Sequence, residues 1–112
     1  MVICEAGDVA VVPFPFTDMA VAKPRPALAL SALKANGEAG NTIFAMITTA
    51  AKSHWPTDVP LSDADAAGLT AASLVRLKLF TLDNRLVSRK IGALSPRDRQ
   101  AVRKMLRAVV GI

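Results

Sequence analysis

Residues 16–30 read FTDMAVAKPRPALAL, and this stretch decides between a helical and a β-rich fold. Its apolar part, Ala27–Ala32, is compatible with either structure by composition. It is short and follows Pro26, which favours a strand. Two prolines flank Arg25 and restrict the backbone on both sides of it, so we expect residues 16–26 to form a stiff loop that leads into this strand.

Further strand-like segments lie on both sides of this stretch. The segment GDVAVVPF, residues 7–14, begins with a Gly-Asp turn and predicts a first strand over Val9–Val12. The segment NGEAGNT, residues 36–42, predicts a turn that joins strands near residues 28 and 45 into a hairpin. The other predicted segments are strands over Thr42–Thr49, Thr57–Leu61 and Ser73–Leu79, a continuation over Phe80–Leu82, and a strand or helical turn over Val87–Ile91.

Apolar and polar residues alternate in Ser73–Leu79. Successive side chains of a strand point to opposite faces of its sheet. The pattern therefore predicts a half-buried strand with Arg76 and Lys78 on its solvent face.

The C-terminal segment SPRDRQAVRKMLRAVVGI predicts an amphipathic helix. Ser95 is a favourable N-cap, Pro96 suits the first helical position, and Asp98 lies in the first turn. Gly111 ends the pattern. One apolar face is formed by Val102, Met105, Leu106, Val109 and Val110. The sequence thus predicts one domain over residues 1–112, with five to seven short antiparallel strands closed by one helix.

Composition narrows the classes of function. The chain of 112 residues carries a net charge of +5. Residues 1–75 hold four basic and seven acidic side chains, whereas residues 76–112 hold ten basic and two acidic ones. This balance fits a polyanionic partner, although a solvated basic helix would give it as well. No stretch approaches 18 apolar residues, so we expect a soluble, cytoplasmic protein with no membrane contact.

Metal and nucleotide chemistry have no support in the sequence. One histidine and one cysteine cannot form a ligand cluster, and Cys4 is expected to be a buried, inert thiol. No glycine-rich loop precedes a helix. We therefore predict no metal and no cofactor.

A few polar and aromatic residues remain as candidates. Ser53, His54 and Asp58 do not fit a hydrolytic triad, because adjacent residues of extended chain point to opposite sides. Trp55 could fill the core or offer a stacking face to a base. Arg25 could form a surface ion pair, but its stiff setting also suits binding of a phosphate that gains charge in a transition state.

Four segments together resemble the PemK/MazF family of toxin endoribonucleases from type II toxin–antitoxin systems. They are GDVAVVPFPFTD, KPRPALAL, MITTAAK and LFTLDNRLVSRKIGALS, in this order along nearly the whole chain. The resemblance implies a mainly β fold, a small SH3-like barrel of the CcdB/MazF type with a C-terminal helix. It also implies a homodimer and metal-independent, sequence-specific cleavage of single-stranded RNA.

The resemblance also implies a site. Arg25 corresponds to the family's arginine before Pro-Ala-Leu, and Thr48 to its threonine after isoleucine. The ribose 2′-hydroxyl would attack the adjacent phosphate, while Arg25 stabilises the charge and Thr48 positions the phosphate. Further RNA contacts are predicted at Phe16, Thr17, Asp18, Lys23, Thr49, Lys52, His54, Trp55, Arg76 and Lys78.

The implied partners are single-stranded RNA and an acidic antitoxin whose disordered tail folds over the basic groove. Leu33 and the apolar side of residues 102–110 are candidates for the dimer interface. Two alternatives stay open. One is a CcdB-like toxin that binds gyrase without chemistry, and the other is a relative that binds RNA but does not cleave it.

Overall fold

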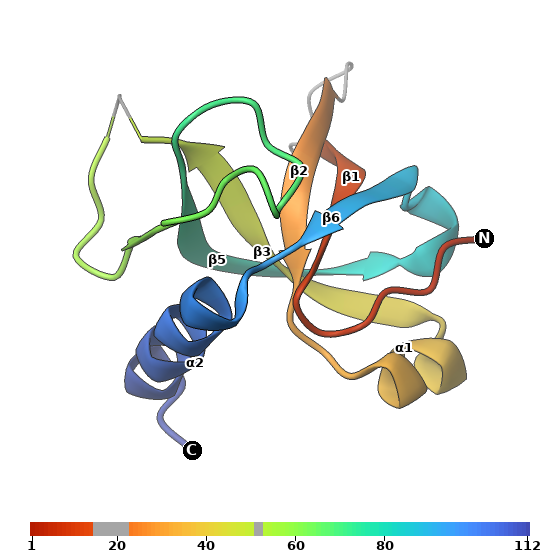
Figure 1. Cartoon of the computed structure of the whole chain (residues 1–112). Helices are drawn as coiled ribbons and strands as arrows, with labels where there is room; N and C mark the ends of the chain where they lie inside the picture. The colour runs from red at the N-terminus through yellow and green to blue at the C-terminus, as the bar shows by residue number, and fades with distance from the viewer. Residues whose placement is uncertain (15–22, 51–52) are drawn as a thin grey trace.

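Six strands form one curled antiparallel sheet in the computed structural model, which describes residues 1–14, 23–50 and 53–112. The strand order is β4-β5-β3-β2-β1-β6, and Figure 1 shows how the sheet curls. The elements are β1 (Asp8–Phe14), β2 (Lys23–Ala29), α1 (Leu33–Ala39), β3 (Asn41–Thr49), β4 (Val59–Pro60), β5 (Ser73–Asp83), the 3₁₀ turn η1 (Asn84–Leu86), β6 (Arg89–Ala93) and α2 (Pro96–Val109). The prediction of a small barrel-like β fold with a C-terminal helix is confirmed, in the form of a half-barrel.

Most predicted strands are present, but β2 begins earlier than expected. The strands predicted around residues 9–12, 42–49 and 73–82 correspond to β1, β3 and β5. Of the stretch predicted over residues 87–91, residues 89–91 belong to β6, and Val87 caps the end of the 3₁₀ turn. Residues 23–26, which we expected in a loop, pair with β1, where Pro24 lies opposite Pro13 and Arg25 opposite Val12.

The predicted hairpin pairing is confirmed, since Leu28 lies opposite Ala45, but the predicted turn is wrong, because α1 occupies most of residues 36–42. Asn36 is fully buried, and its side-chain amide donates hydrogen bonds to the carbonyls of Cys4 (2.8 Å) and Ser31 (3.0 Å). Asn84 donates in turn to the Asn36 carbonyl at 2.8 Å. Gly40, with a φ of 75°, closes the helix. The asparagine that suggested a turn is therefore the centre of a buried polar network.

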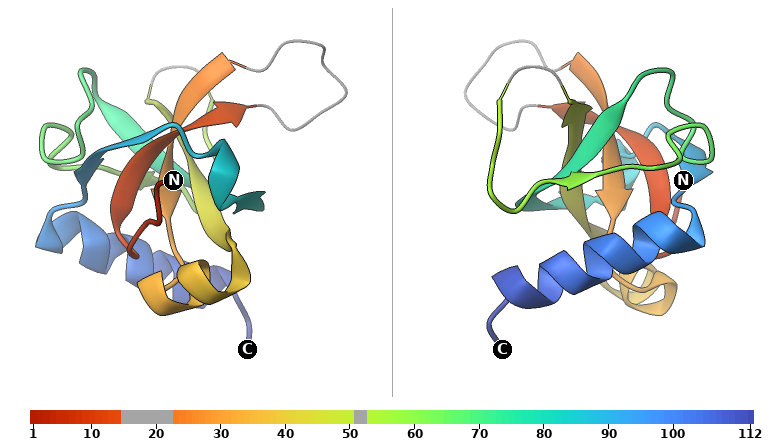
Figure 2. Two further views of the ribbon diagram at one scale, coloured as in Figure 1. Left: turned by 90° about the vertical axis from the view of Figure 1, so that its right-hand side faces the viewer. Right: turned by 60° about the vertical axis from the view of Figure 1, so that its left-hand side comes forward.

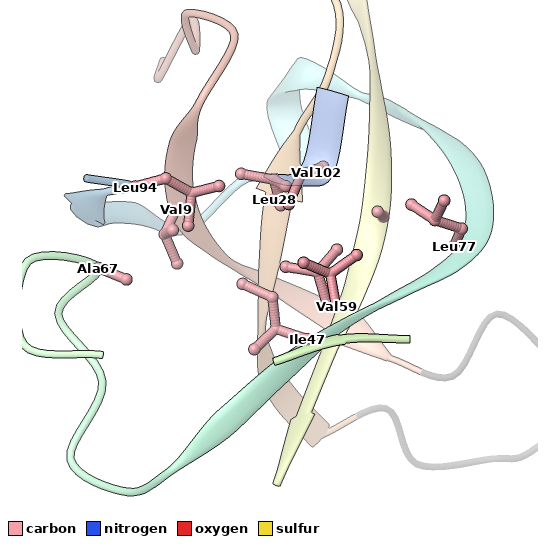
Figure 3. Close-up of a cluster of buried hydrophobic side chains, with 10 residues drawn as sticks. Val9, Leu28, Ile47, Val59, Ala67, Leu77, Leu94 and Val102 are labelled. Atoms are coloured by element: carbon pink, nitrogen blue, oxygen red, sulfur yellow. The ribbon is translucent and has the colours of Figure 1, made fainter. Parts of the chain in front are cut away.

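The two faces of the sheet bury two separate cores. The helix-side core, packed under α2, consists of Val9, Leu28, Ala45, Ile47, Val59, Ala67, Val75, Leu77, Leu94 and Val102 (Figure 3). The pocket-side core consists of Cys4, Ala10, Val12, Ala27, Ala29, Phe44, Leu82 and Val87. Neighbouring residues of β2 and β3 alternate between the two cores, as the period of a strand requires.

The start of α2 is fixed as the sequence predicted, and it is tied to a distant loop. The Ser95 hydroxyl accepts a hydrogen bond from the Asp98 N–H at 3.2 Å. The buried Asp98 carboxylate accepts from the N–H groups of Ser62 (2.8 Å) and Asp63 (2.9 Å) and from the Ser62 hydroxyl (2.7 Å). Burial opposes the charge of Asp98, but these hydrogen bonds prevail and lower its pKa. Among the described residues, no helix is long and apolar enough to cross a membrane.

We predict that Asp98→Ala lowers the free energy of unfolding by about 2–4 kcal/mol, because it leaves the N–H groups of Ser62 and Asp63 without their acceptor. Asp65→Ala, at an exposed carboxylate, is the matched control and should change this free energy by less than about 0.5 kcal/mol. Urea denaturation monitored by circular dichroism measures both. Equal stabilities of the two variants would contradict the assigned role of Asp98.

Candidate active site

A pocket of about 340 Å³ opens where β2 and β3 separate. The start of β2 and the end of β3 lie at the end of the sheet that is remote from α1 and α2 (Figures 1 and 2). The lining residues are Val12, Phe14, Lys23, Arg25, Pro26, Ala27, Met46, Ile47, Thr48 and Phe80. The pocket therefore brings together the two residues that the sequence singled out for chemistry, Arg25 and Thr48.

The prolines of β2 explain why the strands separate. The N–H of Leu30 donates to the Ile43 carbonyl, so the even-numbered residues of β2 direct their N–H groups toward β3. Proline has no N–H group, so neither Pro24 nor Pro26 can continue this ladder. Pairing between β2 and β3 accordingly ends at Ala27 and Met46. The pocket begins where the donors are missing.

Arg25 and Thr48 face each other across this opening. Because Ala27 pairs with Met46 in an antiparallel register, two further steps along each strand place Arg25 opposite Thr48. Both side chains lie on the pocket-side face, since they are two residues from Ala27 and Met46. Arg25 is exposed and Thr48 half-buried. This arrangement presents a guanidinium and a hydroxyl to the same small volume.

The floor of the pocket is apolar and was not among the predictions from the sequence. Phe80 lies between Phe14 and Phe44, with ring centroids 5.9 and 5.7 Å away. Phe14 and Phe80 line the pocket, as does Lys23, two residues before Arg25 on β2. Phe14 and Val12 are two residues apart on one strand, and this spacing indicates that both side chains lie on the same face of the sheet. The contribution of Phe80 depends on the pairing of β5 with β3, which the sequence does not reveal.

Comparison with known proteins identifies the family. The profile described as "PemK-like, MazF-like toxin of type II toxin-antitoxin system" matches residues 5–110. The chain belongs to this toxin family. Its sequence matches no curated protein.

Solved structures share the fold of the toxin. A chain of the MazE-MazF crystal structure (Form-III) from Deinococcus radiodurans is 25% identical, with a TM-score of 0.79 and coverage of 99% of both chains. MazF (Form-I) from the same organism is 23% identical, with a TM-score of 0.78 and coverage of 100% of both chains. A mycobacterial endoribonuclease in complex with its cognate antitoxin is 18% identical, with a TM-score of 0.77 and coverage of 100% of this chain and 97% of that one.

The structure places the remaining predicted RNA contacts unevenly. Thr49 and His54 are exposed near the end of β3, and Lys78 is exposed on β5. Four of the predicted contacts lie outside the described residues: Phe16, Thr17, Asp18 and Lys52. Among the described residues, no group of three His, Cys, Asp or Glu side chains could hold a metal ion.

Arg76 departs from the expectation of a cation on a solvent face, because it is only 7% exposed. Its guanidinium forms a bidentate pair with Asp58, with Nε–Oδ1 at 3.0 Å and Nη2–Oδ2 at 2.9 Å. Its Nη1 donates to the Ser53 hydroxyl at 2.8 Å. Residues 53–58 therefore cover this face of β5 and shield it from solvent. Since Ser53 and Asp58 both bind Arg76, the geometry also gives a hydrolytic triad no support.

Trp55 does not fill the core, which was one of the two roles that the sequence allowed. It is 39% exposed, and its ring lies over the Arg76 guanidinium, 5.0 Å from Cζ to the ring centroid. The backbone N–H of Trp55 donates to Asp58 Oδ2 at 2.9 Å. Cys4, in contrast, is buried as predicted, and burial raises the pKa of its thiol.

We predict that Pro26→Ala extends the ladder between β2 and β3 into the pocket. The new N–H at position 26 would face β3 opposite Ile47 and donate to its carbonyl. Hydrogen exchange followed by NMR should show this amide protected. Pro96→Ala, at the first position of α2, is the matched control. It makes the same proline-to-alanine change, and so has the same kind of effect on the entropy of the unfolded chain, away from the pocket. A freely exchanging amide at position 26 would show that the prolines do not open the pocket.

A second prediction concerns the pH dependence of stability. The hydrogen bonds from Arg76 lower the pKa of Asp58 in the folded state. This stabilisation is fully present above the unfolded pKa of about 4 and is lost as the pH falls through the lower folded value. Asp58→Asn should therefore be least stable relative to wild type above about pH 5, and the gap should narrow below about pH 4. Thermal unfolding at a series of pH values measures this gap, and a constant gap would contradict the assignment.

Proposed function

We propose that this toxin is an endoribonuclease that cleaves single-stranded RNA without a metal ion, with Arg25 and Thr48 as its catalytic residues. The observation that carries the proposal is the meeting of these two side chains at one pocket. Family membership over residues 5–110 supports it and favours it over a gyrase-binding toxin. The mycobacterial structure of the same fold is described as an endoribonuclease.

The reaction takes place within the substrate, which supplies the 2′-hydroxyl as nucleophile, while the pocket supplies hydrogen-bond donors for the phosphate. The ribose 2′-oxygen attacks the adjacent phosphorus, the bond from phosphorus to the 5′-oxygen breaks, and a 2′,3′-cyclic phosphate remains. Water can accept the proton of the 2′-hydroxyl, and water can also donate one to the leaving 5′-oxygen. Negative charge develops on the phosphoryl oxygens, where the Arg25 fork can donate two hydrogen bonds. Arginine is a poor general base, because its guanidinium group holds its proton very strongly.

Thr48 and the apolar floor complete the proposed division of roles. The Thr48 hydroxyl donates to the phosphate across from Arg25 and fixes its orientation. Phe14 and Phe80 provide an apolar surface for the base or ribose beside the scissile bond. Lys23 adds a positive charge for the neighbouring phosphate. The need for a 2′-hydroxyl makes DNA a non-substrate, and mRNA as substrate places the activity in the cytoplasm.

We further infer that an acidic antitoxin neutralises the toxin. Related structures are described as MazE-MazF complexes or as an endoribonuclease with its cognate antitoxin. The net charge of +5 complements an acidic partner. A homodimer is also expected. Leu33, Val109 and Val110 expose 48%, 41% and 40% of their surface and are available for such an interface.

We predict that the purified protein cleaves a long single-stranded RNA in EDTA, and that Arg25→Ala lowers kcat by about 10²- to 10³-fold through loss of charge stabilisation. Thr48→Val should lower it as well. Arg107→Ala, at an exposed arginine of α2, is the matched control and should cleave like wild type. Mapping of 5′ ends and a test for cyclic phosphate identify the products.

The outcomes separate the alternatives. Cleavage at one short motif with 5′-hydroxyl ends supports the proposal. Binding of RNA by folded wild type without cleavage indicates a relative that only binds RNA. Neither binding nor cleavage over many RNA sequences favours the gyrase-binding alternative. Equal cleavage by wild type and Arg25→Ala assigns the chemistry to another residue or to a contaminant.

A further inference from the structure

A second cluster of side chains lies beside the proposed site and has no role in the chemistry. Arg76 binds Asp58 through two hydrogen bonds and Ser53 through its side-chain hydroxyl at 2.8 Å. Asp58 Oδ2 also accepts a hydrogen bond from the backbone N–H of Trp55 at 2.9 Å. The guanidinium carbon lies 5.0 Å from the centroid of the Trp55 ring. One buried arginine therefore fixes both ends of the segment 53–58 and the ring that it carries.

Burial within this cluster is unequal. The side chains of Arg76 and Asp58 are 8% and 2% exposed, whereas Trp55 as a residue is 39% exposed. The charge of Arg76 is balanced by Asp58 and shielded from solvent, so Arg76 is poorly placed to bind a phosphate itself. A large aromatic ring with one face on a guanidinium and much of its surface in solvent is placed to receive a planar partner.

The cluster shares a face of the sheet with the Arg25–Thr48 pocket. Arg76 pairs with Met46, and Leu74 pairs with Thr48. Directly opposed residues of antiparallel strands project from the same face, and adjacent strands lie about 4.8 Å apart. Arg76 is therefore one strand away from Met46, which lines the pocket. A strand of RNA that crosses the pocket would reach Trp55 within a nucleotide or two.

We propose that Arg76 is a positioning residue that holds Trp55 as a fixed stacking platform for a nucleobase next to the scissile phosphate. This inference rests on the proposed function and deepens it. Stacking accepts any base, because every base has a π face. Trp55 therefore supplies affinity and fixes the position of the RNA strand along the pocket. Because Arg76 lies against the ring and Asp58 binds the backbone N–H of Trp55, little conformational entropy is lost when the base binds.

The test uses the intrinsic fluorescence of the protein, because Trp55 is its only tryptophan. The probe is a labelled single-stranded RNA with 2′-O-methyl riboses, which the proposed reaction cannot cleave. Binding is measured by the anisotropy of the label, and stacking by quenching of Trp55. We expect saturable quenching that follows binding in the wild type. Trp55→Ala should weaken binding by about 5- to 100-fold, and Trp55→Phe should restore most of it.

The role of Arg76 needs its own variant. Arg76→Met leaves the Asp58 carboxylate buried without its partner, so the double variant Arg76→Met with Asp58→Asn is tested beside it. Both should lower the fluorescence anisotropy of Trp55 in the free protein and weaken RNA binding, with kcat on cleavable RNA within about 3-fold of wild type and a raised KM. Arg107→Met removes the same charge from α2 and is the matched control. It should change neither the anisotropy of Trp55 nor the affinity for RNA.

The results distinguish this inference from the proposed function. Cleavage and binding by wild type without quenching of Trp55 would overturn the platform and leave the ribonuclease in place. Quenching on binding without cleavage would support the platform and overturn the catalytic proposal. An unchanged Trp55 anisotropy in both Arg76 variants would overturn the positioning role. Absence of binding would overturn the platform, and absence of cleavage as well would overturn both proposals.

Discussion

The missing N–H groups of Pro24 and Pro26 are the constraint on which the rest of the site depends. A central strand ordinarily donates from every second residue to its neighbour. Here Leu30 donates to Ile43, but the two prolines cannot continue the ladder, and pairing of β2 with β3 stops at Ala27. The opening therefore needs no inserted loop. It follows from the loss of two donors in a strand that remains paired with β1 on its other side.

The two faces of the curled sheet differ in role: one packs against α2 and stabilises the fold, and the other carries the pocket. Under α2, the helix-side core is apolar, and Asp98 joins the start of that helix to residues 62–63. The opposite face carries the pocket and, beside it, the buried pair of Arg76 and Asp58. Burying two charges costs desolvation that apolar residues would not incur. Such a pair on the pocket face is better explained by the geometry that it imposes on Trp55 than by a need for stability.

Much of the fold could be predicted from local patterns. The first, third and fifth strands follow from β-branched and alternating residues, and α2 follows from Ser95, Pro96 and its apolar period. The turn predicted at residues 36–42 failed because Asn36 and Gly37 have turn propensity, whereas burial of Asn36 against Cys4 and Asn84 outweighed it. The alternation of β5 was interpreted correctly as two faces, but the face of Arg76 is covered by residues 53–58 instead of solvent.

The sequence by itself determined the elements that depend on near neighbours: the strands, the cap of α2, the backbone without donors at Pro24 and Pro26, and the candidates Arg25 and Thr48. Only the tertiary structure decided which of these meet. The register of β2 against β3 sets Arg25 across from Thr48, and the path of residues 53–58 over β5 joins Asp58 to Arg76. Such contacts depend on the pairing and curl of strands far apart in the chain, and a local pattern of residues carries no information about either.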